Sequence, residues 1–428
     1  SRGLGDVYKR QPDMAADNLV QTTESLVNFL QITDWGYTPQ NGTIAETWQG
    51  CYTIINNANI IINNIDKLTT PENQKQANKI KGQVLAVRAL VHFDLLRYFG
   101  EDFDRNSTAR GIFYKKTSVL EESPVSTKPA RQTVKQNYDD IFADLNAARA
   151  LLSDIDAPVN SGAKYKIDLV GLSAIYARVA LYAKDWPLAI SNSTTVINAL
   201  PLANSSVYPL IWKDQSNAEV AFSVFYSPGE FLSRLAGDVF SGPNNRSQFE
   251  GDPTLFSTFD ETNDVRFQSS VIRGYGTLAL PARSSSRFTV VKFLGKGAAT
   301  DGVVDWKAFR TGEMYLIRAE AYANTSGQGA AALADLNTLR AARINGFVNG
   351  TESGAALLQA IASERRKELF MEGHRWFDLK RTSKTIDRGT VFSPTTQSQL
   401  APNRREWVWP IPQGERDANP NMEQSTGY

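Results

Sequence analysis

The stretch IASERRKELFMEGHRWFDLK, residues 361–380, places charged and aromatic side chains on a helical pattern. Glu364 and Glu368 lie four residues apart and therefore share one helical face, as a paired general acid and base would. Each of them also has Arg or Lys neighbours at helical spacing, which favours ionised, paired carboxylates over an acid with a raised pKa. We therefore interpret these residues as a structural charge network that closes a helical array, and not as a catalytic site.

Apolar residues recur at helical spacing along much of the chain. Between residues 44 and 65, Trp48, Tyr52 and Ile55 follow one another at three- and four-residue steps. Similar patterns predict further helices over residues 76–99, 134–152, 168–183, 186–200, 311–324, 328–342 and 354–370. The sequence thus predicts a mainly α fold.

Three of the predicted helices share a short motif. In each, an Arg precedes His or Tyr by four residues, with small and apolar residues between them, at Arg88, Arg178 and Arg318. Helices of this type, rich in Ala, Tyr and Leu, are typical of tetratricopeptide-like repeats. Because the spacing between the copies is irregular, we predict a degenerate array of such repeats over residues 44–200 and 311–380.

Residues 201–305 differ from the helical parts. They are rich in Ser, Gly, Pro and Asn and contain two β-like runs, at residues 220–225 and 288–293. Their aromatic content argues against disorder, so we expect a long irregular insertion that folds onto the repeats and builds a ligand-facing surface. We expect one domain over residues 12–428, and a non-native origin for residues 1–11 (SRGLGDVYKRQ).

Composition excludes several classes of function. Lys and Arg total 46 against 45 for Asp and Glu, which disfavours nucleic acid or an anionic membrane surface as a partner. Cys51 is the single cysteine, and His92 and His374 are the only histidines, so a Cys- or His-rich metal centre is not expected. We expect no cofactor, although Ca²⁺ at the Asp/Asn-rich residues 260–264 stays an open alternative to a simple turn.

An ordered set of motifs extends the opening stretch in both directions. They are DMAADN (13–18), WQGCYTIINNAN (48–59), KGQVLAVRALVHFDLLRYFG (81–100), TGEMYLIRAEAYA (311–323), LADLNTLR (333–340) and WPIP (409–412). From about residue 12 to the end, the chain resembles the SusD/RagB family of outer-membrane nutrient-binding lipoproteins.

The resemblance implies a protein on the cell-surface side of the outer membrane, held by an N-terminal lipidated cysteine. Such a protein would pass oligosaccharides, or peptides in some branches, to a TonB-dependent outer-membrane transporter. The lipid-bearing cysteine and signal peptide of the family are not seen in this sequence, since Cys51 falls within a predicted helix. We attribute that departure to truncation.

Glycan recognition relies on aromatic rings and directed polar groups. Trp35 and Tyr37 lie in a Gly/Pro/Asn-rich loop that we expect to expose their rings, and Asn41 follows as a hydroxyl partner. By resemblance, the loop ahead of the first repeat helix contributes to the sugar site. Tyr275 and Trp306 come from the insertion and its return, the other region that the resemblance assigns to the ligand. Ordinary loop packing is the alternative for each of these residues.

We therefore predict a glycan-binding protein that is not an enzyme and captures oligosaccharides for a transporter. One alternative is a repeat scaffold of the same type that binds a peptide or a protein. A glycoside hydrolase is the other, but it needs two carboxylates roughly 5–10 Å apart across the scissile bond, and no pair in the sequence stands out for that role.

Overall fold

The computed structural model describes residues 11–22, 29–118, 128–152, 164–226, 248–273, 287–389 and 395–428. These residues form two compact units. Unit 1 comprises Tyr37–Asn192 and Arg404–Tyr428, and unit 2 comprises the chain before Tyr37 together with Ser193–Asn403. The expected single domain over residues 12–428 and the origin of residues 1–11 stay predictions.

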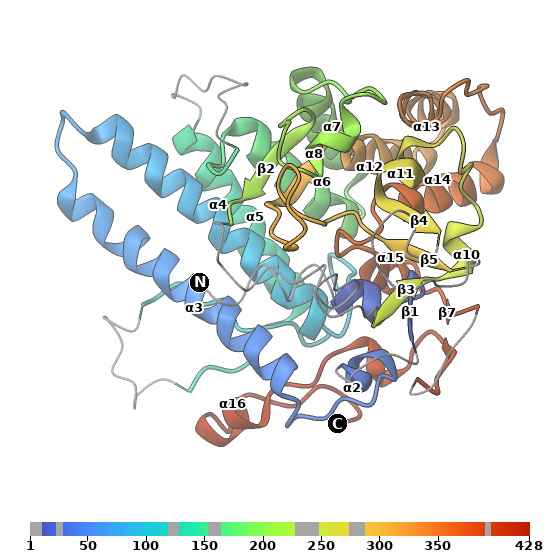
Figure 1. Cartoon of the computed structure of the whole chain (residues 1–428). Coiled ribbons are helices and arrows are strands. Elements are labelled where there is room, and N and C mark those ends of the chain that lie inside the picture. The colour runs from blue at the N-terminus through green and yellow to red at the C-terminus, as the bar shows by residue number, and fades with distance from the viewer. Residues whose placement is uncertain are drawn as a thin grey trace. The chain divides into compact units, whose positions relative to one another are not determined.

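Unit 1 is built from long helices. They are α3 (Gly42–Asn64), η1 (Ile65–Leu68), α4 (Gln74–Phe99), α5 (Val134–Leu152) and α6 (Leu169–Tyr182), followed by α7 (Trp186–Ala199), within which unit 1 ends. Helix α4 packs against α3 on one side and α5 on the other, and α3 and α4 run side by side as an antiparallel pair (Figure 1). The C-terminal segment adds η3 (Arg405–Trp407) and α16 (Gln413–Ala418).

A buried ion pair joins consecutive helices in each unit. Arg88 of α4 donates both Nε and Nη2 to the carboxylate of Asp144 on α5, each at 2.7 Å. In unit 2, Arg318 of α12 (Thr311–Ala323) makes the same bidentate contact with Asp335 of α13 (Gly329–Arg343), again at 2.7 Å. The repeated Arg of the sequence motif therefore ties one helix of a pair to the next at Arg88 and at Arg318.

Unit 2 combines longer helices with short strands. Helix α12 packs against both α13 and α14 (Gly354–Glu368), and Ala319, Leu336 and Ile361 form the core of this group. Shorter helices complete the unit, namely α2 (Leu30–Thr33), α8 (Tyr208–Ile211), α10 (Pro253–Phe256), α11 (Val265–Ser270) and α15 (Arg375–Arg381). Small residues such as Ala319 allow the close approach of helices that the repeat motif predicted.

Within the described residues, the strands of unit 2 form three small antiparallel sheets. The largest has the order β1 (Leu19–Gln21), β3 (Phe249–Gly251), β5 (Phe288–Val290) and β4 (Val271–Arg273) (Figure 1). The others pair β2 (Val220–Val224) with β6 (Trp306–Arg310), and β7 (Ile386–Asp387) with β8 (Gln399–Leu400). The predicted β-like runs become β2 and β5.

The mainly α class, with helix pairs and a long insertion that carries short strands, is confirmed. Of the helices among the described residues, none combines the length and the apolar character that crossing a membrane requires.

Candidate ligand-binding site

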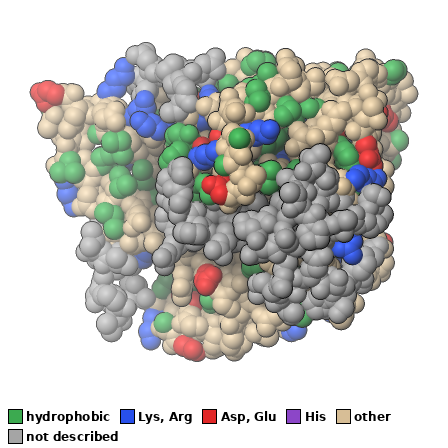
Figure 2. Space-filling model, in the orientation of Figure 1, with side chains coloured by type: hydrophobic (Ala, Val, Ile, Leu, Met, Phe, Trp, Pro, Cys, Tyr) green, Lys and Arg blue, Asp and Glu red, His purple; other side chains and the backbone are tan. Residues whose placement is uncertain are grey.

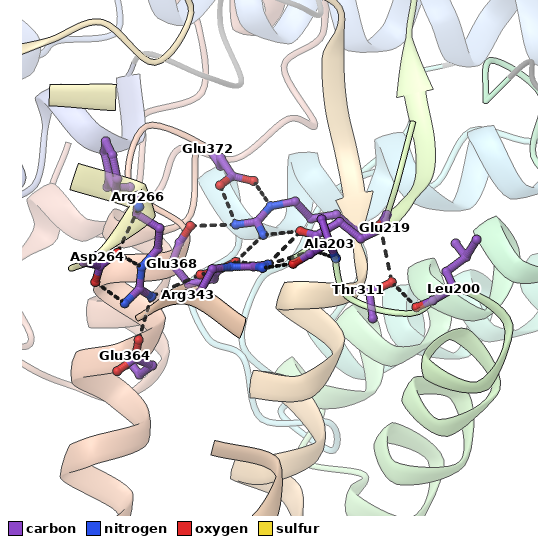
Figure 3. Close-up of polar contacts among 12 residues, drawn as sticks. Leu200, Ala203, Glu219, Asp264, Arg266, Thr311, Arg343, Glu364, Glu368 and Glu372 are labelled. Atoms are coloured by element: carbon purple, nitrogen blue, oxygen red, sulfur yellow. Dashed lines mark hydrogen bonds and ion pairs between the residues drawn. The ribbon is translucent and has the colours of Figure 1, made fainter. Parts of the chain in front are cut away.

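The glutamates at 364, 368 and 372 are buried and paired with basic side chains. Glu368 accepts hydrogen bonds from Arg310, from Arg343 at 3.0 Å and from Arg266 at 3.1 Å (Figure 3). Burial alone would raise the pKa of Glu368, but the three guanidinium groups outweigh it and hold that pKa below its usual range. The expected pairing of Glu364 and Glu368 with basic side chains is confirmed.

The network extends beyond Glu368 to four more carboxylates. Figure 3 shows Asp264, Glu364 and Glu372 around the same arginines, with Glu219 reaching in from the start of β2. Each carboxylate has an arginine within 3.0 Å. A general acid needs a proton at neutral pH, and the lowered pKa of Glu364, Glu368 and Glu372 beside their arginines does not suit that role.

Trp35 is buried rather than exposed. It is 6% exposed and adopts a left-handed backbone conformation, with φ of 55°. Its indole Nε1 donates to the carbonyl of Ala15 at 2.8 Å, and the guanidinium of Arg388 lies 4.4 Å from the ring centroid. The expected exposure of this ring is therefore wrong, because the loop anchors itself to the N-terminal segment. A ligand-binding role for Trp35 stays a prediction.

Tyr37 and Asn41 have structural contacts in unit 1. The hydroxyl of Tyr37 donates to the carbonyl of Glu406, and its ring meets Trp409 edge to face, with 6.3 Å between the centroids. Burial raises the pKa of Tyr37, so the hydroxyl is a donor at any ordinary pH. The exposure expected of this ring is also wrong, because only 2% of Tyr37 is accessible.

Asn41 caps helix α3. Its Oδ1 accepts a hydrogen bond from the backbone N–H of Ile44 at 3.1 Å, which satisfies one of the free N–H groups at the start of the helix. The side chain is buried. Contact of Tyr37 or Asn41 with a ligand stays a prediction.

Tyr275 lies outside the described residues. Trp306 begins strand β6 and pairs with Val224 of β2, with 9% of the residue exposed. Its sequence neighbours Asp305 and Lys307 join a cluster of charges with Asp214, which lies in the short turn that follows α8. Trp306, one of the predicted ligand residues, thus lies next in sequence to a cluster of charged side chains that is partly exposed.

An exposed aromatic ring lies at the end of β2, next to that group. Phe225 is 50% exposed, and the ammonium of Lys296 lies over its ring, 4.5 Å from the centroid. We call Phe225, Lys296, Asp214, Asp305 and Lys307 the Phe225 cluster. Figure 2 shows side chains of both charges close together over the loop between β5 and β6, which contains Lys296.

Hydrogen bonds fix the polar members of the Phe225 cluster. Lys296 Nζ lies 2.5 Å from Asp305 Oδ1 and 3.5 Å from Asp214 Oδ2. Asp214 also accepts from Lys307 and, at 2.9 Å, from the backbone N–H of Asp305. Burial lowers the pKa of Lys307, although the carboxylate of Asp214 opposes that shift. Lys296 is the most accessible of the four charged side chains, at 25%.

Few features of the sequence distinguish Phe225 from the other aromatic residues of the insertion. Strand β2 is buried along most of its length, on both faces, so its sequence does not alternate between apolar and polar residues. Without that alternation, a buried aromatic side chain cannot be told from an exposed one. The available signal was the position of Phe225 at the end of a β-run, directly before Tyr226 and a Ser-Pro-Gly turn sequence.

Within the described residues, no group of three or more His, Cys, Asp or Glu side chains is arranged to hold a metal ion. In the loop at residues 260–264, Asp260 accepts hydrogen bonds from the N–H groups of Thr262 and Asn263, each at 3.0 Å. Asp264 forms a bidentate pair with Arg266. The two carboxylates therefore have protein partners, and Ca²⁺ binding at this loop stays a prediction.

Two family models match separate parts of the chain. One, described as "SusD family", matches residues 282–428, and the other, described as "Starch-binding associating with outer membrane", matches residues 6–180. SusD-like protein P38 of Formosa agariphila is 24% identical, in an alignment that covers 97% of this chain and 86% of that protein.

Solved structures share the fold along the whole chain. A SusD superfamily protein of Bacteroides vulgatus has a TM-score of 0.84 and 23% identity, covering 99% of this chain and 94% of its own. A protein of the same species described as a putative sugar binding protein has a TM-score of 0.79 and 26% identity, covering 98% and 92%. Since the two family models match its two ends and similar proteins extend over nearly all of it, the chain belongs to the SusD family.

Proposed function

We propose that this protein binds oligosaccharides at the cell-surface side of the outer membrane and delivers them to a TonB-dependent transporter. The observation that carries the proposal is the match of residues 6–180 to a family model described as starch-binding and associated with the outer membrane. A structural relative described as a sugar binding protein, at 26% identity, supports the same class of ligand. Attachment through an N-terminal lipid belongs to this proposal.

The Phe225 cluster supports glycan binding on physical grounds. Sugars combine an apolar C–H face with a rim of hydroxyls, so a site for them needs an accessible ring beside fixed donors and acceptors. Phe225 provides the ring, and Lys296, which Asp305 holds over that ring, provides a donor. Paired, ionised carboxylates such as Glu368 favour a binding protein over a hydrolase.

Affinity electrophoresis and calorimetry with a panel of polysaccharides test the proposal. We expect binding to at least one glycan of the panel, without release of reducing sugar during prolonged incubation. If no glycan binds while short peptides do, the peptide-binding alternative replaces the proposal. Release of reducing ends from a bound glycan would instead establish a hydrolase.

Delivery to a transporter needs a separate experiment. We expect a tagged copy of this protein to purify with the TonB-dependent transporter encoded beside it, when both are expressed in their native membrane. A transporter that purifies without this protein, under conditions where both are present, would contradict the delivery half of the proposal.

A further inference from the structure

Phe225 presents a partly exposed ring with a cation over it. A large aromatic side chain is usually buried, yet half of this one is exposed, at 50%. The ammonium group of Lys296 lies 4.5 Å above the ring, and Lys296 is itself held by Asp305 at 2.5 Å. A cation held over a ring restrains that ring, which lowers the cost of ordering it when a ligand binds.

We infer that Phe225 and Lys296 form a subsite for one uncharged sugar unit, an inference that rests on the proposed function. The C–H face of a sugar ring would pack on the exposed surface of Phe225. Hydroxyls at the edge of the sugar would accept hydrogen bonds from the partly exposed Lys296 ammonium, which the buried carboxylate of Asp305 holds in place. Lys296 acts here as a positioning residue for the ring as well as a donor.

Charge favours an uncharged sugar over a uronic acid. The segments around Phe225 contain as many lysines as aspartates, namely Lys213, Lys296, Lys307, Asp214, Asp301 and Asp305. Lys296 and Lys307 each already contact a carboxylate, so neither offers an unpaired positive charge to an acidic ligand. A uronate would add a negative charge beside Asp214 and Asp305, whereas a neutral sugar meets no such repulsion.

Calorimetry on the whole protein tests the subsite with two sets of probes. The neutral set is starch, xyloglucan, galactomannan and laminarin, and the acidic set is polygalacturonate and alginate. We expect the wild type to bind a neutral glycan with little dependence on ionic strength, since no net charge is neutralised. Phe225→Ala should weaken that binding about tenfold or more, as the loss of an aromatic anchor usually does.

Matched variants separate binding from folding. Tyr165→Ala removes a ring that is exposed to a similar extent, 45%, in unit 1, and should leave affinity unchanged. Phe225→Trp, which enlarges the platform, should retain affinity. Lys296→Arg should keep most of the binding, because it keeps the cation over the ring, and Lys296→Met should weaken it several-fold.

The outcomes distinguish this inference from the proposed function. If the wild type binds a glycan and Phe225→Ala binds it equally well, the subsite is wrong and the proposed function stands. If the wild type binds only acidic glycans, with affinity that falls steeply as salt rises, the neutral ligand class is wrong. If the wild type binds no glycan, the proposed function fails and the subsite fails with it.

Discussion

Replacing Glu368 by Gln should strongly destabilise unit 2. The side chain is fully buried and accepts hydrogen bonds from Arg266, Arg310 and Arg343. Gln keeps the shape of the side chain, but it removes the negative charge and turns an N–H₂ group toward guanidinium donors. Removing one partner of a buried ion pair costs about 3–5 kcal/mol, because a charge is left without compensation.

The remaining contacts place the expected loss toward the lower end of that range. After the substitution, Arg266 still contacts Asp264 and Glu364, while Arg310 and Arg343 still contact Glu219. No arginine is left without a carboxylate, so we expect a loss of about 3 kcal/mol in the free energy of unfolding.

Urea unfolding, followed by circular dichroism at neutral pH, measures this loss. Glu261→Gln is the matched control, because Glu261 pairs with Arg273 in the same unit while the two side chains are 40% and 38% exposed. An exposed pair contributes about 0–1 kcal/mol, so the control should change stability little. If Glu368→Gln costs no more than Glu261→Gln, the network contributes no more than a surface ion pair, and the reasoning is refuted.

Three further measurements test the contacts described above. The pKa of Glu372 is held low because Arg310 and Lys292 outweigh the effect of its burial. Its stabilising contribution is therefore present at neutral pH and should be lost as the pH falls below about 4, which urea unfolding across a pH series measures. Burial raises the pKa of Asp13 to about 6, so ionised Asp13 disfavours folding near neutral pH. As the pH falls from 7 to 5 the wild type should gain stability relative to Asp13→Asn, and a constant difference in their free energies of unfolding would contradict this. Trp35→Ala should lower the free energy of unfolding by about 3–5 kcal/mol, the usual loss for a buried large aromatic side chain, whereas an unchanged midpoint in urea would indicate an exposed ring.

The helices could be predicted from the sequence because their signals are local. The stripe through Trp48 and Ile55 predicts a helix over residues 44–65, and the structure has α3 at Gly42–Asn64. The pattern after Thr311 likewise predicts residues 311–324, and α12 spans Thr311–Ala323. Periodicity of apolar residues and the capping residues at each end lie within a few turns of the chain, so a single sequence contains them.

The environment of the predicted ligand residues could not be read in the same way. A loop rich in Gly, Pro and Asn can expose its rings or can use them as anchors, and both kinds of loop have the same local composition. Tyr37 is buried because its hydroxyl reaches the carbonyl of Glu406, 369 positions later in the chain. Trp35 is buried through Ala15 and Arg388, which are also distant in sequence. Contacts at such separations leave no periodic trace in the sequence.

Two of the motifs that carry the family resemblance are in contact with each other in unit 2. Met371 and Gly373 adopt positive φ values of 62° and 82°, and their backbone N–H groups donate to the carboxylate of Asp13 at 3.1 and 3.2 Å. Asp17, in the same N-terminal motif, forms a bidentate pair with Arg375 at 2.6 and 2.8 Å.

These contacts explain why the two motifs occur together without any reference to a ligand. Residues 361–380 provide the backbone N–H groups of a turn and an arginine, and residues 13–18 provide the carboxylates that accept their hydrogen bonds. If either motif were absent, the buried polar groups of the other would lose these hydrogen-bond partners. A residue that must satisfy a buried partner cannot vary with the ligand. Phe225 lies outside every one of these motifs and its ring is half exposed. A different residue at this position would therefore leave the contacts between the two motifs intact, so the residue type can vary with the ligand. The stretch that identifies the family is for this reason a poor guide to the ligand, and substitutions at Phe225 are where differences in glycan preference should appear.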